Sequence, residues 1–168
     1  TGLPLYHRTC NELSERITEN YSTSFSIGIK AFGAEHRPPI YAIYGFVRFA
    51  DEIVDTFHEY DQQSLMLEFR SETYKAIDRG ISLNPVLHAF QKVVQEYNID
   101  RHLIDAFLDS MSMDLDMVSH EQASYEKYIY GSADVVGLMC LKVWCKGDEK
   151  MYQDLEPEGR ALGAAFQK

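Results

Sequence analysis

"YGFVRFADEIVDTF", residues 44–57, is apolar at most positions yet carries Arg48, Asp51, Glu52 and Asp55. The apolar residues here and just before it recur at intervals of three and four, the period of an α-helix with one face in a core. This stripe is formed by Ile40, Ile43, Val47, Ala50, Val54 and Phe57. Phe46, Phe49 and Ile53 cover much of the remaining surface, so little of the helix is left for solvent.

A second stripe of side chains lies beside the apolar stripe, offset from it by one residue along the helix, and has the same spacing. It is formed by Tyr41, Tyr44, Arg48, Asp51 and Asp55, whose side chains therefore project along one line of the helix. Asp51 and Asp55 repel each other at this spacing, and the repulsion grows when the carboxylates are removed from water. A cationic group is therefore expected beside them.

Two interpretations of this stripe remain open. Arg48 can form a structural salt bridge with one carboxylate, as ion-pair networks commonly do. Alternatively, Mg²⁺ can bind, because its octahedral shell takes one or two carboxylates plus waters and phosphate oxygens, and Arg48 can then grip a phosphate. Asp105 and Asp109 have the same spacing but lie on the polar side of their helix, where a solvated face is expected.

Length and composition limit the class of protein. The chain has 168 residues and a formal charge of −10, which suits one domain and disfavours contact with nucleic acid or anionic headgroups. It has no segment typical of a signal peptide or a membrane span. Three cysteines without zinc-ligand spacing favour a reduced compartment. We expect a cytoplasmic protein, and contact with a membrane surface stays open.

Helical periodicity dominates the chain, so the predicted class is all-α, with about six or seven helices in a single domain over residues 1–168. Residues 21–38 are expected to be a connection. Helices are expected over residues 5–20, 39–57, 61–80, 84–98, 100–117 and 121–146, with a last one opening at Pro157. Gly131 and Gly137 inside the sixth indicate close approach of a backbone or ligand, or a local break.

Four motifs together resemble the squalene and phytoene synthase family of head-to-head prenyl synthases. They are "STSFS" (22–26), "YGFVRFADEIVD" (44–55), "YIYGSADVVGLM" (128–139) and "ALGAAFQK" (161–168). The resemblance runs from about residue 15 to the end of the chain. It implies an isoprenoid-synthase-type helical bundle that binds a prenyl diphosphate.

The resemblance also implies residue roles. Asp51 and Asp55 would ligate Mg²⁺, or Mn²⁺ in its place. Together with Arg48 and Tyr128 they would act in catalysis. Tyr128 would lie near the reacting carbons. The diphosphate would be contacted by Ser22, Ser24, Phe25, Tyr44, Arg48 and Gln167. Tyr41 is a further candidate for the wall of an apolar cavity, or a core residue.

Two departures from the family pattern stand out. Asp134 occupies a position where the family usually has glycine. The chain stops at Lys168, before the second aspartate-rich motif that the family places shortly after Gln167. The sequence is therefore interpreted as the N-terminal part of such an enzyme, with the C-terminal helices missing and with oligomeric state open.

The resemblance implies a transferase that joins two allylic diphosphates head to head through a cyclopropylcarbinyl diphosphate. Geranylgeranyl diphosphate would give phytoene, a carotenoid precursor. Farnesyl diphosphate would give squalene or dehydrosqualene, and NADPH would be needed only for a squalene-type product. A non-catalytic homologue that holds prenyl diphosphate is an alternative. A head-to-tail synthase or terpene cyclase is another, but the serine-rich segment and the helix from Tyr128 argue against it.

Overall fold

The computed structural model describes residues 1–116 and 122–166, and within these ranges it is helical with no strand. The elements are α1 (Leu3–Tyr21), α2 (Thr23–Lys30), a 3₁₀ turn η1 (Ala34–His36), α3 (Arg37–Asp55), α4 (Gln62–Arg79), α5 (Pro85–Tyr97), α6 (Arg101–Asp116), α7 (Gln122–Ile129), a π-helical turn η2 (Tyr130–Asp134), α8 (Val135–Cys145) and α9 (Glu149–Phe166). The all-α class predicted from the sequence is confirmed.

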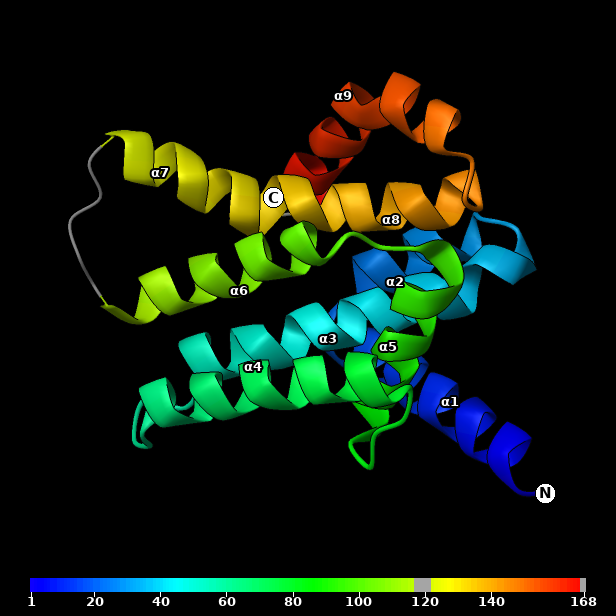
Figure 1. The fold of residues 1–168 in the computed structure, drawn as a ribbon, viewed down its shortest axis with the longest axis horizontal. Helices are drawn as coiled ribbons and strands as arrows, with labels where there is room; N and C mark the ends of the chain where they lie inside the picture. Colours follow the sequence, from blue (N-terminus) through cyan, green and yellow to red (C-terminus); the bar gives the residue numbers. More distant parts are fainter. Residues whose placement is uncertain (117–121, 167–168) are drawn as a thin grey trace.

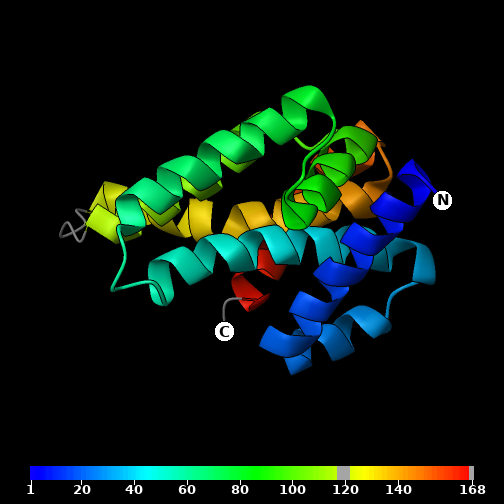
Figure 2. The same ribbon diagram turned by 90° about the horizontal axis from the view of Figure 1, so that it is seen from below.

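Helix α3 lies at the centre, in contact with α1, α4, α5, α6 and α8 (Figures 1 and 2). Its Phe46 ring stacks on Phe90 of α5 at a centroid distance of 3.9 Å and lies 5.5 Å from Phe69 of α4. Phe107 of α6 closes this group at 5.4 Å. Four helices therefore meet around one aromatic stack.

No helix of the described ranges is both long enough and apolar enough to cross a bilayer.

The predicted helix boundaries hold where polar caps mark them. The Asp61 carboxylate accepts a hydrogen bond from the Ser64 amide at 3.0 Å and begins α4, which ends at Gly80 with φ 70°. The Asn84 side chain accepts from the amides that follow Pro85 and begins α5.

Two expectations about boundaries are wrong. Residues 23–30, expected within a connection, form α2, because the Ser22 hydroxyl accepts from the Phe25 amide at 3.2 Å and caps a new helix. Pro157 lies inside α9 rather than at its start. That helix begins at Glu149, and the Asp148 carboxylate accepts from the Met151 amide at 3.0 Å in its first turn.

The two helix glycines singled out in the sequence are sites of close backbone approach. A Cβ at Gly131 would lie 2.3 Å from the Ala106 carbonyl oxygen of α6, and one at Gly137 would lie 2.0 Å from the Gly159 carbonyl oxygen of α9. The local break is present as well, because η2 interrupts the long helix at Gly131. Both features that the glycines indicated are therefore found together.

Candidate active site

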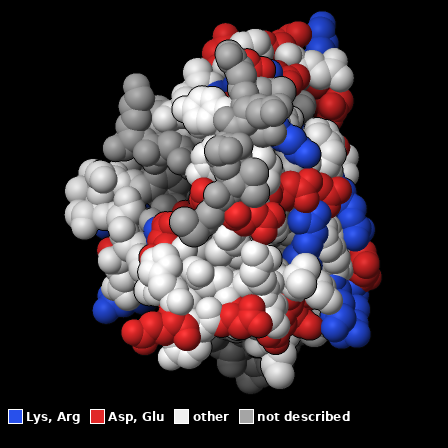
Figure 3. Space-filling model, turned by 90° about the vertical axis from the view of Figure 1, so that its left-hand side faces the viewer, with Lys and Arg blue, Asp and Glu red and all other residues white. Residues whose placement is uncertain are grey.

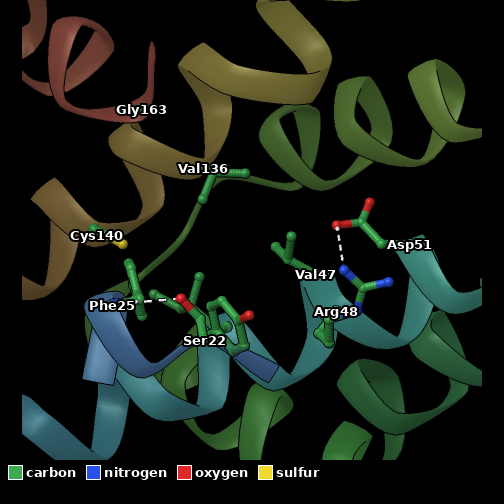
Figure 4. Close-up of a pocket in the computed structure, with 10 residues that line it drawn as sticks. Ser22, Phe25, Val47, Arg48, Asp51, Val136, Cys140 and Gly163 are labelled. Atoms are coloured by element: carbon green, nitrogen blue, oxygen red, sulfur yellow. Dashed lines mark hydrogen bonds and ion pairs between the residues drawn. The ribbon is translucent and has the colours of Figure 1, made fainter. Parts of the chain in front are cut away.

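A cavity of about 240 Å³ lies between α2, α3, α8 and α9 (Figure 4). It is lined by Ser22, Phe25, Ile43, Tyr44, Val47, Arg48, Asp51, Val136, Cys140 and Gly163. Figure 4 shows Phe25, Val136 and Cys140 toward one end, and Arg48 and Asp51 toward the other. The cavity therefore has an apolar end and a charged end.

The second stripe of α3 supplies one wall of this cavity. Tyr44, Arg48 and Asp51 follow one another at helical spacing and all line it. The Tyr44 ring stacks on Phe25 of α2 with centroids 4.8 Å apart, so α2 covers the start of the stripe. Ser24 points elsewhere: it is exposed on α2 and is not among the lining residues. Tyr41 is buried in the core.

Arg48 is held mainly by a residue that the sequence analysis did not single out. Its Nη2 donates to Glu52 Oε1 at 2.6 Å, whereas the nearest carboxylate oxygens of Asp51 and Asp55 lie 3.9 Å from the guanidinium. The guanidinium also sits 5.0 Å from the centre of the Tyr21 ring. The i, i+4 spacing of Arg48 and Glu52 was the available signal. The two aspartates are consequently left incompletely neutralised.

Asp51 shows the effect of this incomplete neutralisation. Burial raises the pKa of Asp51 from its usual value near 3.8 to about 6, against the opposing influence of Arg48. The carboxylates of Asp55, Asp114 and Glu52 contribute to this rise, and the pKa of about 6 results from all of these influences together. The charged end of the cavity therefore carries surplus negative charge, and a bound cation would relieve it.

Tyr128 belongs to the same acidic cluster. Its hydroxyl donates to Asp114 Oδ2 of α6 at 3.1 Å. Burial and then Asp114 raise the pKa of Tyr128 to about 12, with smaller contributions from Asp51 and Asp55. Asp114 has no local sequence signal, because it joins the site only through the contacts of α6 with α3 and α7.

The comparison pair on α6 differs from Asp51 and Asp55 in its partners rather than in its overall exposure, because the Asp51 and Asp55 side chains are 30 % and 63 % exposed. The side chains of Asp105 and Asp109 are 46 % and 44 % exposed, as expected for a solvated face. Arg70 of α4 donates to Asp109 at 2.9 Å, and Tyr74 donates to Asp105. This pair therefore forms a surface cross-link between α4 and α6.

The donor set of the charged end fits a hard divalent cation that arrives with its own ligands. Within the described ranges, no three carboxylate, imidazole or thiol groups converge into a complete metal cage. Mg²⁺ needs only one or two carboxylates when waters and phosphate oxygens complete its shell, and Asp51 and Asp55 can supply them.

Figure 3 shows acidic side chains in a band across the end of the molecule where α3 and α6 finish, with basic ones along a flank.

Gln167, expected on the diphosphate side, lies outside the described residues. Helix α9 (Glu149–Phe166) reaches the cavity, because Gly163 is one of the lining residues. The structure thus brings Ser22, Phe25, Tyr44, Arg48 and Asp51 around one cavity and couples Asp55 and Tyr128 to its charged end.

The family model described as squalene/phytoene synthase matches residues 18–168. The chain belongs to this family. The match begins within α1 and includes every motif on which the resemblance depends.

Curated relatives come from both product branches of the squalene/phytoene synthase family. The phytoene synthase of Arthrospira platensis is 28 % identical and covers 93 % of this chain, and that of Pseudescherichia vulneris is 26 % identical and covers 88 %. The presqualene diphosphate synthase of Rhodopseudomonas palustris is 24 % identical over 73 % of the chain. The chain spans 54 %, 50 % and 44 % of the lengths of these three enzymes.

Solved structures of the squalene/phytoene synthase family have the same fold. A dehydrosqualene synthase solved in complex with a ligand superposes with a TM-score of 0.80, and the squalene synthase HpnC of Alicyclobacillus acidocaldarius with 0.79. Each is 21 % identical in sequence. The matched region covers 96 % and 95 % of this chain and 55 % and 60 % of those chains.

Replacing Glu52 with glutamine should lower the pKa of Asp51 by about one unit. The substitution removes one nearby negative charge and frees Arg48 to turn toward Asp51, and both changes favour the ionised carboxylate. Carbon-13 NMR titration of labelled aspartate side chains measures this pKa. A pKa of Asp51 that stays the same in Glu52→Gln would show that Glu52 does not divert Arg48.

Proposed function

We propose that this protein is a Mg²⁺-dependent prenyltransferase that condenses two allylic diphosphates head to head. The observation that carries the proposal is the charged end of the cavity, where the partly buried Asp51, with its side chain 30 % exposed, has a raised pKa beside Asp55 and Arg48. Such an arrangement suits a metal-bound diphosphate, and the apolar end beside it suits a prenyl chain. The family membership supports the same reaction class.

Each residue of the cavity has a distinct task in this proposal. Arg48 binds the diphosphate through its planar guanidinium, and Glu52 and the Tyr21 ring hold that guanidinium in place. Asp51 and Asp55 would hold Mg²⁺, which would supply positive charge against the charge that develops on a departing diphosphate. The Ser22 side chain borders the same space and caps the helix that carries Phe25.

The apolar end protects the carbocation that remains after ionisation. Phe25, Tyr44 and Val136 exclude water from the reacting carbons, and the faces of the aromatic rings favour positive charge.

Tyr128 keeps its proton at neutral pH, because its pKa is raised to about 12. It therefore acts as a hydrogen-bond donor, oriented by Asp114, and not as a general base.

Geranylgeranyl diphosphate is the proposed substrate and phytoene the proposed product. Two of the three curated relatives described above are phytoene synthases, and these two have the higher identity and the greater coverage of this chain. Product analysis after incubation with geranylgeranyl or farnesyl diphosphate, with and without NADPH, tests this choice. A product formed from farnesyl diphosphate alone would assign the protein to the squalene-type branch.

Calorimetric titration with a non-hydrolysable geranylgeranyl thiodiphosphate, with and without Mg²⁺, tests the site itself. Binding to the wild-type chain should require Mg²⁺. It should weaken by more than about tenfold in Asp55→Asn, because a metal ligand is lost. Asp109→Asn is the matched control, because Asp109 has the same motif spacing but pairs with Arg70 of α4 and is not among the residues that line the cavity, and it should bind normally. Equal affinity in both variants would refute the metal assignment.

A further inference from the structure

Asp134, which stands where the family usually has glycine, has a specific partner on α9. Its Oδ2 accepts a hydrogen bond from Arg160 Nε at 3.0 Å, and the Asp134 side chain is only 17 % exposed. The same guanidinium lies 5.1 Å from the centre of the Tyr130 ring. Because Tyr130 and Asp134 are the first and last residues of η2, one arginine of α9 contacts both ends of this turn.

Near Gly163 the contact is built from backbone, whereas the side chains of Leu138 and Leu141 of α8 pack over Gly159. A Cβ at Gly163 of α9 would lie 2.1 Å from the Ala133 carbonyl oxygen of η2, and Gly137 of α8 meets the backbone of Gly159 and Gly163. Glycine faces allow helices to approach closely but lack the side-chain ridges that normally resist sliding. Directed polar contacts help to specify how far along η2 and α8 the last helix sits. Lys142 of α8 donates to Glu149 at the start of α9 at 3.1 Å, and the Asp134–Arg160 pair acts at the other part of α9, one turn from Gly163.

The location of the pair connects it to the cavity. Arg160 precedes Gly163 by one helical turn, and Gly163 lines the cavity together with Val136 and Cys140. A shift of α9 along α8 would move this wall relative to Arg48 and Asp51, which line the other side.

We infer that Asp134 and Arg160 are a positioning pair. The pair sets the register of α9 against η2 and α8, and it thereby fixes the cavity wall to which Gly163 belongs. The departure from the family glycine is thereby matched by an arginine on the facing helix. The consequence for ligand affinity rests on the proposed function, whereas the consequence for the cavity wall does not.

Cys140 is a built-in reporter for this inference. It lines the cavity and is only 3 % exposed, so iodoacetamide reaches it only when the wall opens. Alanine at Asp134 or at Arg160 should raise its alkylation rate by about fivefold, the effect expected of one partly exposed ion pair. The double variant should react no faster than either single variant, because both remove the same contact. Trypsin cleaves after Lys142, so mass spectrometry separates Cys140 from Cys145.

Two further variants make the test specific. Asp78→Ala removes an exposed ion pair with Arg101 between α4 and α6 and should leave the alkylation rate of Cys140 unchanged. Arg160→Lys keeps the charge and should react at a rate between those of wild type and Arg160→Ala. Unchanged rates in Asp134→Ala and Arg160→Ala would overturn the inference, and so would effects that add in the double variant.

A ligand titration separates this inference from the proposed function. Asp134→Ala should bind geranylgeranyl thiodiphosphate with Mg²⁺ about fivefold more weakly than wild type. Faster alkylation with unchanged affinity would overturn the link between the pair and the site. If the wild-type chain bound no analogue, the proposed function would fail, while the alkylation rates would still decide whether the pair fixes α9.

Discussion

Replacing Asp51 with asparagine should stabilise the folded chain at pH 8 by about 2 kcal/mol and at the same time abolish Mg²⁺-dependent binding of a prenyl thiodiphosphate. The pKa of Asp51 is raised from near 3.8 to about 6 in the folded state, so its ionised form is disfavoured by folding. Asparagine removes that unfavourable charge, but it also removes a metal ligand.

The pH dependence of this gain has a defined sign. Above pH 6 the wild-type carboxylate is ionised in both states, and the folded state is penalised in full. As the pH falls from about 6 to about 4, the folded state takes up a proton that the unfolded state lacks, and the penalty is lost. The stability difference between Asp51→Asn and wild type should therefore close over this interval.

Urea unfolding monitored by circular dichroism, at pH 8 and at pH 4.5, measures the difference. Asp109→Asn is again the control: it removes the negative charge that pairs with Arg70 on the surface, so it should give no gain at pH 8. A loss of stability in Asp51→Asn at pH 8, together with normal analogue binding, would show that Asp51 is a structural partner of Arg48.

Replacing Gly137 with alanine should destabilise the chain by about 3 kcal/mol. The new Cβ would lie 2.0 Å from the Gly159 carbonyl oxygen and 2.5 Å from the Gly163 amide nitrogen. Neither backbone atom can rotate away as a side chain can, so α8 and α9 would have to separate. The midpoint of urea unfolding measures the cost.

Gly28 provides the matched control for this substitution. It lies within α2, and a Cβ there would meet no other atom within 4 Å. Gly28→Ala should therefore be neutral or stabilising by up to about 1 kcal/mol, because alanine favours helix. Similar stability of the Gly137 and Gly28 variants would show that the backbones of α8 and α9 do not approach as closely as described.

Local signals in the sequence were sufficient for most of the helices. Asp61, Gly80, Asn84 and Pro85 act within a few residues of their own positions, and each begins or ends a helix as predicted. The start of α9 also had a local signal in Asp148, but Pro157 drew the prediction away from it, although α9 accommodates a proline in its interior. In the same way, Ser22 lies in the stretch expected to be a connection, although it caps α2.

In the candidate site too, local spacing predicted some of the residues, whereas contacts between distant segments were not predicted. Tyr44, Arg48 and Asp51 share a stripe of one helix, so their common direction followed from spacing alone. Asp114 joins the site only because α6 packs against α3 and α7, and the role of Asp134 depends on Arg160 of a different helix. Contacts between elements distant in sequence leave no periodic pattern in either element, so the sequence could not predict them.

Paramagnetic broadening of labelled aspartate carboxylates by Mn²⁺, recorded by carbon-13 NMR with geranylgeranyl thiodiphosphate present, tests the central claim most directly. Mn²⁺ occupies sites of the same oxygen ligands as Mg²⁺ and broadens only nearby nuclei. Resonances are assigned by their loss in the matching asparagine variants. The account predicts that the signals of Asp51 and Asp55 broaden first, while those of Asp105 and Asp109 stay sharp. Equal broadening of all four, or sharp signals from Asp51 and Asp55, would contradict it.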